Sequence, residues 1–445
     1  METTSYSDRR NELFTELRAL PAIDCHEHLR FGHMGDWRRA QETTFPYVGS
    51  LSGILQAPYL HGFLPDPLRG ETFWQPRSLE SRNERQAIIT ALSDIARTQP
   101  SVYRANLVIP FRDLYDYDIT QLRLNDWNLL DQRIRQQYEQ GPWQRLARLA
   151  EQLSVRRIIK ISVTPGYYQV WLETLSTEDR RIEQELFACT INVDSFIRYR
   201  PRTGSEIDQS FERLAENCNG CLDTFKDYGE VVTRTFDAFR QTPAVGFKTG
   251  MAGYRRFDDP VVPLTRGPSL YEAPRLDAAQ MRDWQSLMFG IVAQEAGRVG
   301  LPLGIHAGFD GEGRSPVGLE PIIADNARTD FIIIHAGCPH YIDTANLAVH
   351  YPNVHVDLTW IPVIDFSAAV DAYEHLLRVV PSDHLTLGAD AHYPETFYGM
   401  WTVHLEALAA ALTRLIDRHG WSRTQAVSLA RRVLNENPVQ LYGLD

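Results

Sequence analysis

Short apolar runs that each end in a polar residue of a metal-binding or catalytic type recur along this chain, and they limit the folds that it can adopt. LPLGIHAGF, DFIIIHAG and HLTLGADAH end such runs at His306, His335 and Asp390, and AVGFKTG places Lys248 at a similar point. Uninterrupted apolar runs of this length are typical of strands buried on both faces of a parallel sheet. In a parallel barrel, functional side chains gather where the strands end.

The strand candidates alternate with helical patterns. The eight candidates lie near residues 20–26, 155–164, 186–194, 244–249, 301–306, 330–335, 353–358 and 384–390. Helical patterns such as 278–300 and 367–380 separate the later ones. This alternation predicts an α/β fold, namely a distorted TIM-like (β/α)8 barrel.

The first connection breaks that rhythm. Residues 30–150 separate the first strand from the second, whereas a βα connection usually has about 2–6 residues. The segment contains helix-type patterns such as RNERQAIITALSDIAR. We therefore expect a single barrel domain over residues 1–445, with a helical insertion at 30–150. Such an insertion either shapes a substrate pocket at the mouth of the barrel or serves only in packing.

Composition narrows the classes of partner. The formal net charge of −12 argues against non-specific binding to nucleic acid or to anionic lipid. No apolar stretch approaches the ~20 residues that span a bilayer, and the start METTSYSDRRNELF lacks the apolar core of a signal peptide. We expect a cytoplasmic protein that acts on a small molecule. Self-association into a homo-oligomer is compatible with the sequence, but no interface patch is identifiable.

A pair of histidines follows the first strand candidate. His26 and His28, in PAIDCHEHLRFG, are separated by one residue, so a strand directs both imidazoles to the same side. Imidazole is a ligand for zinc and neighbouring first-row metals. With His306 and Asp390 approaching from other strand ends, the pattern predicts a divalent metal site. Zinc is the leading candidate and manganese the alternative.

The same groups suggest a chemistry. A divalent ion lowers the pKa of bound water to around 7 and polarises a carbonyl group. A carboxylate beside it can accept a proton and later return it to a leaving group, and Asp390 is best placed for that role. His335 could stabilise developing oxygen charge, assist proton transfer or complete a second metal site.

Lys248 has three readings that the sequence leaves open. A lysine carboxylated by carbon dioxide can bridge two metal ions, which would make the site binuclear. An unmodified lysine supplies a positive charge or, when partly buried, a base of lowered pKa. The third reading is a structural ion pair with a nearby carboxylate.

The order His-x-His, Lys, His, His, Asp along an alternating chain resembles the amidohydrolase superfamily. More narrowly, the second half is similar to the amidohydrolase module of FluG-type and nodulin/glutamine-synthetase-like proteins. The segments that carry this likeness are FKTGMAGYRR, IHAGFDGEG, IIIHAGCPHYIDTANLAVHYPNVHVDLTW and LGADAHYPETFYG. The insertion, with SVYRANL and DLYDYDI, is faintly similar to the uronate-isomerase branch.

The resemblance implies a metal bound by His26, His28 and Asp390, with His306 close by. It also implies that Asp390 acts in proton transfer and that His335 acts in catalysis or in binding a second metal. The leading hypothesis is metal-dependent hydrolysis of a C–N bond, of the amide type, in a small carboxylate-bearing molecule. A decarboxylase and a uronate-isomerase-like isomerase are the enzymatic alternatives. A non-catalytic binding module is disfavoured because every proposed group is present.

Substrate contacts are predicted from residues beside the strand ends. Arg255, which lies within a matched segment, is the leading candidate because guanidinium groups hold carboxylates at two points. Tyr254 precedes it, and His340 and His392 follow the sixth and eighth strand candidates. Each of these residues also has a packing, pairing or helix-capping alternative.

Overall fold

Eight parallel strands form the centre of the fold and follow one another around the sheet in chain order. The computed structural model describes residues 5–29, 49–69, 78–163, 172–201, 203–204, 208–308 and 315–444. The strands are β1 (Ala22–Glu27), β2 (Val155–Val163), β3 (Phe187–Asn192), β4 (Ala244–Thr249), β5 (Leu303–His306), β6 (Phe331–Ile334), β7 (Val354–Asp357) and β8 (Leu385–Thr386). The TIM-like barrel expected from the sequence is therefore confirmed.

A seam between β1 and the segment after β8 joins the two ends of the sheet. Three backbone hydrogen bonds make this seam: Cys25 N to Leu387 O at 3.1 Å, Asp390 N to His26 O at 2.8 Å and His28 N to Ala391 O at 2.9 Å. The seam brings the His-x-His pair beside Asp390, although the two segments lie far apart in the sequence.

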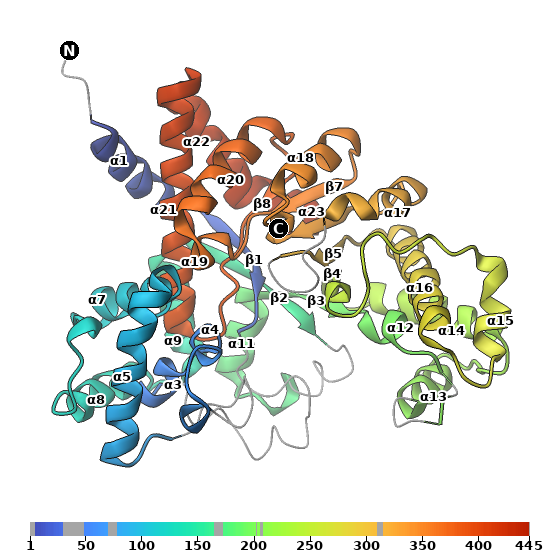
Figure 1. Cartoon of the computed structure of the whole chain (residues 1–445), viewed down its shortest axis with the longest axis horizontal. Helices are drawn as coiled ribbons and strands as arrows, with labels where there is room; N and C mark the ends of the chain where they lie inside the picture. Colours follow the sequence, from blue (N-terminus) through green and yellow to red (C-terminus); the bar gives the residue numbers. More distant parts are fainter. Residues whose placement is uncertain are drawn as a thin grey trace.

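Helices surround the strands (Figure 1). Those outside the first connection are α1 (Tyr6–Arg18), α11 (Thr177–Leu186), α12 (Asp194–Arg198), α13 (Asp208–Asn217), α14 (Phe225–Arg240), α15 (Gly267–Glu272), α16 (Ala278–Val299), α17 (Glu320–Asp325), α18 (Tyr341–His350), α19 (Ile361–Ile364), α20 (Phe366–Val379), α21 (Pro394–His419), α22 (Arg423–Arg431) and α23 (Asn437–Tyr442). Within the described parts of the chain, none of the helices is long and apolar enough to cross a membrane.

The boundaries of the longest helices follow from local sequence signals. α16 begins after Asp277, whose carboxylate accepts hydrogen bonds from the amides of Ala279 and Gln280 at 2.8 and 2.9 Å. It ends at Gly300, which adopts the left-handed conformation with φ of 69°. A side-chain cap at the start and a left-handed glycine at the end satisfy backbone groups that a helix leaves unpaired.

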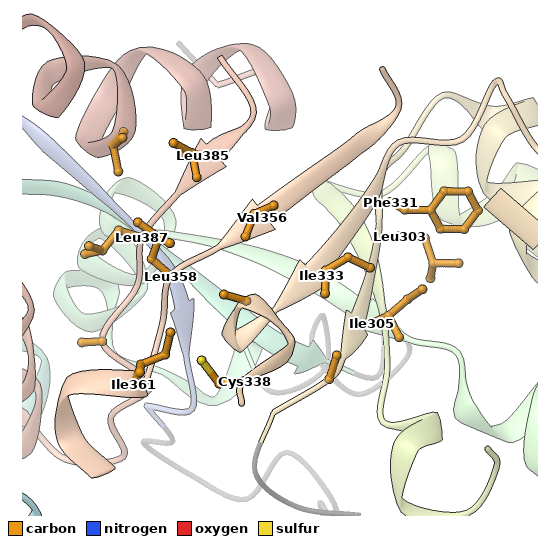
Figure 2. Packing of buried hydrophobic residues seen from close by; sticks show 14 of the residues in the cluster. Leu303, Ile305, Phe331, Ile333, Cys338, Val356, Leu358, Ile361, Leu385 and Leu387 are labelled. Atoms are coloured by element: carbon orange, nitrogen blue, oxygen red, sulfur yellow. The ribbon is translucent and has the colours of Figure 1, made fainter. Parts of the chain in front are cut away.

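Apolar side chains pack on both sides of the strands. Leu303, Ile305, Phe331, Ile333 and Val356 belong to the large core that includes the surrounding helices (Figure 2). A smaller cluster takes residues from β1, β2, β3, β6 and α23: Ile23, Cys25, Ile159, Ile161, Ala188, Ile332, Ile334 and Tyr442. Because β2 and β6 are not neighbours in the sheet, their side chains can meet only inside the barrel.

The connection from β1 to β2 is helical where it is described, as the sequence predicts. Residues 30–48 and 70–77 of the predicted insertion lie outside the described residues. The rest contains α3 (Leu51–Leu55), α4 (Pro58–His61), α5 (Arg82–Thr98), α6 (Pro100–Tyr103), α7 (Ile109–Tyr115), α8 (Trp127–Gln137), α9 (Pro142–Gln152) and the π-helical turn η2 (Arg104–Val108). Except for α9, whose apolar side chains belong to the large core, these helices share an apolar cluster of their own, which Tyr393 joins from the segment after β8.

A buried charged network ties this insertion to the start of α21. Glu395 is fully buried and accepts hydrogen bonds from the hydroxyls of Tyr115 and Tyr138 at 2.7 and 2.5 Å. Arg145 forms an ion pair with the same carboxylate at 3.3 Å. A buried charge is tolerated only when it is paired and hydrogen-bonded, so these contacts hold the insertion against the barrel.

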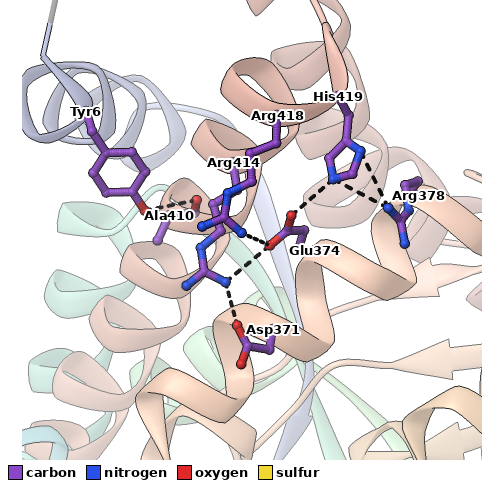
Figure 3. A network of polar contacts seen from close by, with 8 residues as sticks. All are labelled: Tyr6, Asp371, Glu374, Arg378, Ala410, Arg414, Arg418 and His419. Atoms are coloured by element: carbon purple, nitrogen blue, oxygen red, sulfur yellow. Dashed lines mark hydrogen bonds and ion pairs between the residues drawn. The ribbon is translucent and has the colours of Figure 1, made fainter.

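A second network lies at the surface, where α21 packs on α20. Glu374 of α20 accepts hydrogen bonds from Arg414 at 3.1 Å, Arg418 at 3.4 Å and His419 at 3.1 Å, all on α21 (Figure 3). Tyr6 of α1 donates to the carbonyl of Ala410 at 3.5 Å in the same region. The N-terminal helix is thereby attached to the last long helix of the barrel.

Replacing Glu395 should destabilise the protein strongly. We expect Glu395→Ala to lower the free energy of unfolding by about 3 kcal/mol, because it leaves the buried Arg145 without its counter-charge. Urea denaturation followed by circular dichroism measures this change. Asp94→Ala, which removes an exposed pair with Arg97, is the control and should cost less than about 1 kcal/mol. Equal effects of the two variants would contradict the role given to Glu395.

The seam should not tolerate a side chain at Gly388. A Cβ atom there would lie 2.5 Å from the amide nitrogen and 2.7 Å from the Cβ of His26, so backbone would have to move. We expect Gly388→Ala to cost about 1–3 kcal/mol in unfolding free energy. Gly290→Ala in α16, where no atom lies within 4 Å, should instead be neutral or stabilising by up to about 1 kcal/mol. A neutral Gly388→Ala would show that the seam is not tightly packed.

Candidate active site

The polar residues at the strand ends converge on one cavity of about 430 Å³. This volume falls in the range of small-molecule sites, about 300–1,000 Å³. The barrel contributes His28, Lys248, His306, His335, Trp360, Asp390 and His392 to its lining, and the insertion contributes Pro58, Tyr59 and Gly62. The strand ends and the insertion therefore share one pocket.

Asp390 lies at the centre of the histidines. Its Oδ1 is 3.6 Å from Nε2 of His26 and 3.4 Å from Nε2 of His28. Its Oδ2 is 3.9 Å from Nε2 of His335. Asp390 and the His-x-His pair are therefore neighbours across the seam, although they lie at the last and the first strand of the barrel.

His335 links the cluster to the β7 exit and to β5. Its Nδ1 lies 3.3 Å from the carbonyl oxygen of Thr359, and its Nε2 lies 3.2 Å from Nδ1 of His306. A carbonyl can only accept, so the proton of a neutral His335 belongs on Nδ1 and Nε2 carries a lone pair. The imidazole therefore turns Nε2 toward Asp390 and His306.

Several residues at the strand ends adopt the left-handed backbone conformation, which is rare outside glycine. The φ angles are 61° at His335, 50° at Ala336, 72° at Trp360 and 67° at Asp390. Each such residue costs on the order of 1–3 kcal/mol and persists only where its surroundings hold it. These residues follow β6, β7 and β8, so the strain is concentrated at the cavity.

Two buried carboxyl groups of β1 hold the residues on either side of Asp390. Oδ1 of Asp24 accepts a hydrogen bond from the amide of Ala389 at 3.2 Å. Oε2 of Glu27 accepts one from the amide of Ala391 at 2.7 Å. Both side chains are fully buried. The sequence-based interpretation did not assign a role to either residue, although an acid within an apolar strand is itself a signal.

Burial dominates the electrostatics of the cluster. It raises the pKa of Asp390 to about 8, even though the hydrogen bond with Tyr59 and the charge of Lys248 act to lower it. It lowers the pKa values of His26 and His335 well below the ordinary value, and nearby positively charged groups act in the same direction. Both imidazoles are therefore neutral at pH 7, which is the form that binds metal ions.

The buried donors and acceptors fit a divalent cation. Ligand atoms of His26, His335 and Asp390 all lie within 4.8 Å of one another. Neither ring nitrogen of His26 nor Oδ1 of Asp390 has a hydrogen-bond partner among the described residues. Buried polar atoms are costly when they lack a partner, and a shared cation would satisfy these. This group contains His335, which the sequence assigned to catalysis or to a second metal, whereas His28 and His306 contact it from the sides.

Of the predicted substrate contacts, His392 reaches the cavity. Its ring stacks on that of His28 with centroids 5.2 Å apart and an interplanar angle of 7°. It also meets the ring of Tyr59 edge-on at 5.3 Å.

Tyr254, Arg255 and His340 do not line the cavity as the described residues define it. The guanidinium of Arg255 is buried and donates to Ser286 Oγ at 3.0 Å and to two backbone carbonyls of its own loop. Tyr254 donates to Asp194 at 2.8 Å, and His340 lies 4.0 Å from Asp343 beside α18. These residues anchor loops, so the prediction that Arg255 binds a substrate carboxylate is not supported.

Two aromatic residues of the cavity were missed. The ring of Trp360 lies 5.0 Å from that of His335, and the ring of Tyr59 lies 5.7 Å from Trp360. Trp360 follows β7 in the way that the other site residues follow their strands, so the same pattern could have found it. Tyr59 belongs to the short helix α4 of the insertion, where no such pattern exists.

Comparison with known proteins gives one family match and one sequence relative. Residues 272–444 match the family model described as amidohydrolase. Protein FluG of Emericella nidulans is 26% identical over 251 residues, which cover 50% of this chain and 29% of FluG. The chain thus spans less than a third of that relative's length.

Solved structures with the same fold cover nearly the whole chain. Uronate isomerase of Thermotoga maritima has a TM-score of 0.72 at 12% identity, covering 98% of this chain and 97% of its own. Glucuronate isomerase of Caulobacter crescentus also has a TM-score of 0.72, at 15% identity, covering 100% of this chain and 96% of its own. At such low identity these likenesses show the fold alone. The family match and the FluG similarity confirm the resemblance to the amidohydrolase superfamily that the sequence motifs indicate.

Proposed function

We propose that this protein is a metal-dependent hydrolase that cleaves a C–N bond, of the amide type, in a small carboxylate-bearing molecule. The observation that carries the proposal is the position of Asp390. Its carboxyl group lines a cavity of about 430 Å³ and lies within 3.4–3.9 Å of ring nitrogens of three histidines.

His26, His28 and Asp390, the set that the resemblance implies, would hold the cation, and zinc is the leading candidate. The ligand atom of His335 lies within 4.8 Å of those of His26 and Asp390 and so within reach of the same ion. When bound, a divalent ion polarises a carbonyl oxygen and makes a water molecule a stronger nucleophile. The lowered pKa values of His26 and His335, and the ring nitrogens of His26 that have no hydrogen-bond partner among the described residues, support this assignment.

Asp390 is the group that moves the proton. It is buried, and its pKa of about 8 in the protein alone is raised by that burial, so the carboxyl group can exchange a proton near neutral pH. A neighbouring cation would favour its carboxylate form. Asp390 would take a proton from the attacking water and return it to the leaving nitrogen. The backbone hydrogen bonds on both sides of it limit how far it can shift.

The aromatic residues would orient the substrate and limit the access of water. Trp360 and Tyr59 form neighbouring walls of the cavity, and Tyr59 also hydrogen-bonds to Asp390. His335, with its proton on Nδ1, offers Nε2 toward the reaction centre and could stabilise oxygen charge once protonated.

Lys248 would receive the substrate carboxylate. It is 5% exposed and lines the cavity, whereas Arg255 lies elsewhere. A carboxylated lysine would bridge two metal ions, but His306 and His335, the histidines beside the first ion, hydrogen-bond to each other, which favours an unmodified lysine. The described residues then offer one buried group of converging ligand atoms at this site rather than two.

Asp390→Asn should remove most activity. Loss of the proton-transferring group is expected to lower kcat by about 10²-fold or more, measured on amides of small carboxylic acids with release of ammonia or amine as the readout. Asp383→Asn is the control, because Asp383 lies two residues before β8, at the end of the strand opposite Asp390, and its side chain is 54% exposed. Full activity of Asp390→Asn, or a product that is carbon dioxide or an isomer of unchanged mass, would reject the proposed reaction.

Lys248→Ala should weaken substrate binding and leave the metal in place. We expect KM to rise by about 10-fold or more, since a charge-assisted contact contributes about 1.5–3 kcal/mol. Lys248→Arg should retain most of the affinity because it keeps the charge. Metal content measured on the same samples should be equal in all three proteins. A fall from two ions to one in Lys248→Ala would instead identify a carboxylated, bridging lysine.

A further inference from the structure

A second cavity of about 470 Å³ lies where α1, the insertion and the helices after β7 and β8 meet. None of its lining residues belongs to the active-site cavity. Its volume is comparable to that of the active site, and it too lies between the insertion and the barrel. Small-molecule sites occur preferentially at such boundaries.

Two arginines make part of the lining of this cavity cationic. Arg104 donates to both carboxylate oxygens of Glu406, at 2.8 and 2.6 Å, so its charge is largely balanced. Arg10 also lines the cavity but forms no ion pair with any described residue. Its hydrogen bond goes to the neighbouring Asn11 side chain at 3.4 Å. The preceding residue Arg9 is instead paired with Asp417. Among the described residues, the cavity thus presents one guanidinium charge, that of Arg10, without a paired carboxylate.

Apolar side chains make up a further part of the lining, which we call the apolar wall. Phe14, Pro362, Phe366 and Val403 form this wall, and the guanidinium of Arg104 lies over the ring of Phe366 at 5.9 Å. A guanidinium binds a carboxylate at two points, and aromatic and aliphatic side chains bury a flat apolar body. The cationic and apolar parts of the lining together suit a molecule that is apolar at one end and anionic at the other.

The segment behind this wall is part of the active site. Pro362 lies in α19, which begins directly after Trp360, and the amide of Trp360 donates to Nε2 of His404 at 3.1 Å. His404 follows Val403 of the wall on α21. A molecule in the second cavity would therefore rest against the two segments that fix Trp360 beside His335.

We propose that this cavity is a second binding site that takes a small aromatic carboxylate or a similar apolar organic anion. The carboxylate pairs with Arg10, and the apolar body packs on Phe14 and Phe366. The site is separate from the proposed catalytic reaction, and its occupation stabilises the Trp360 segment from behind.

Benzoate is a suitable probe, with benzamide as the uncharged molecule of the same shape. Isothermal titration calorimetry on the metal-loaded protein should show saturable benzoate binding that weakens about 10-fold or more in Arg10→Gln. Arg9→Gln, on the same helix but outside the cavity, should bind as the wild type does. Benzamide should bind the wild type about 10-fold more weakly than benzoate.

The proposal is overturned if benzoate shows no saturable binding, or if its binding is the same in Arg10→Gln as in the wild type. The second result would place the binding away from Arg10, with the active site as one alternative. Equal affinity for benzamide and benzoate would also overturn it. This comparison uses only the wild-type protein, so it does not depend on the folding of a variant. None of these outcomes depends on whether the enzyme hydrolyses amides.

Discussion

The seam between β1 and the segment after β8 is the constraint on which the site depends. Backbone hydrogen bonds join the two segments, and carboxyl groups of Asp24 and Glu27 hold the amides of Ala389 and Ala391. Asp390, between those two alanines, is thereby kept in a left-handed conformation with φ of 67°. Without the seam, His26 and His28 at β1 and Asp390 after β8 would lie at opposite ends of an open sheet. Closing the barrel and assembling the site are therefore one event, and the absence of a side chain at position 388 is part of both.

Burial then sets the chemistry. The same desolvation that raises the pKa of Asp390 lowers those of His26 and His335. The neutral imidazoles of His26 and His335 consequently lie beside a carboxyl group with a raised pKa, and among the described residues some of their buried polar atoms have no hydrogen-bond partner. Such an arrangement costs stability in the protein alone, and a bound cation would recover it. The insertion completes the pocket from the other side. The insertion is attached to the barrel through Glu395, five residues after Asp390. The same segment therefore positions both Asp390 and the insertion that carries Tyr59.

The sequence predicts the barrel and the converging strand ends well because both rest on local signals. An apolar run followed by His306, His335 or Asp390 reports a strand and its exit without any knowledge of the rest of the fold. The direction of a loop side chain, in contrast, depends on contacts with residues far away in the sequence. Tyr254 and Arg255 follow β4 closely, yet both turn toward the loop's own neighbours, Asp194 and Ser286. Tyr59, in contrast, lines the pocket although no sequence pattern predicts it. Its position results from how the insertion packs on the barrel, which hydrophobic periodicity does not specify.

The central claim is that His26 and its neighbours hold a divalent cation, and metal content tests it most directly. Inductively coupled plasma mass spectrometry should be run on wild type, His26→Ala and His350→Ala after reconstitution with zinc and dialysis. His350 is exposed on α18 and bonds to the carbonyl of Asn346 in its own helix, so its removal controls for loss of a surface histidine. We predict about one ion per chain in wild type and His350→Ala, as for a mononuclear zinc site, and little metal in His26→Ala. Equal metal content in all three proteins, or none in wild type, would contradict the account.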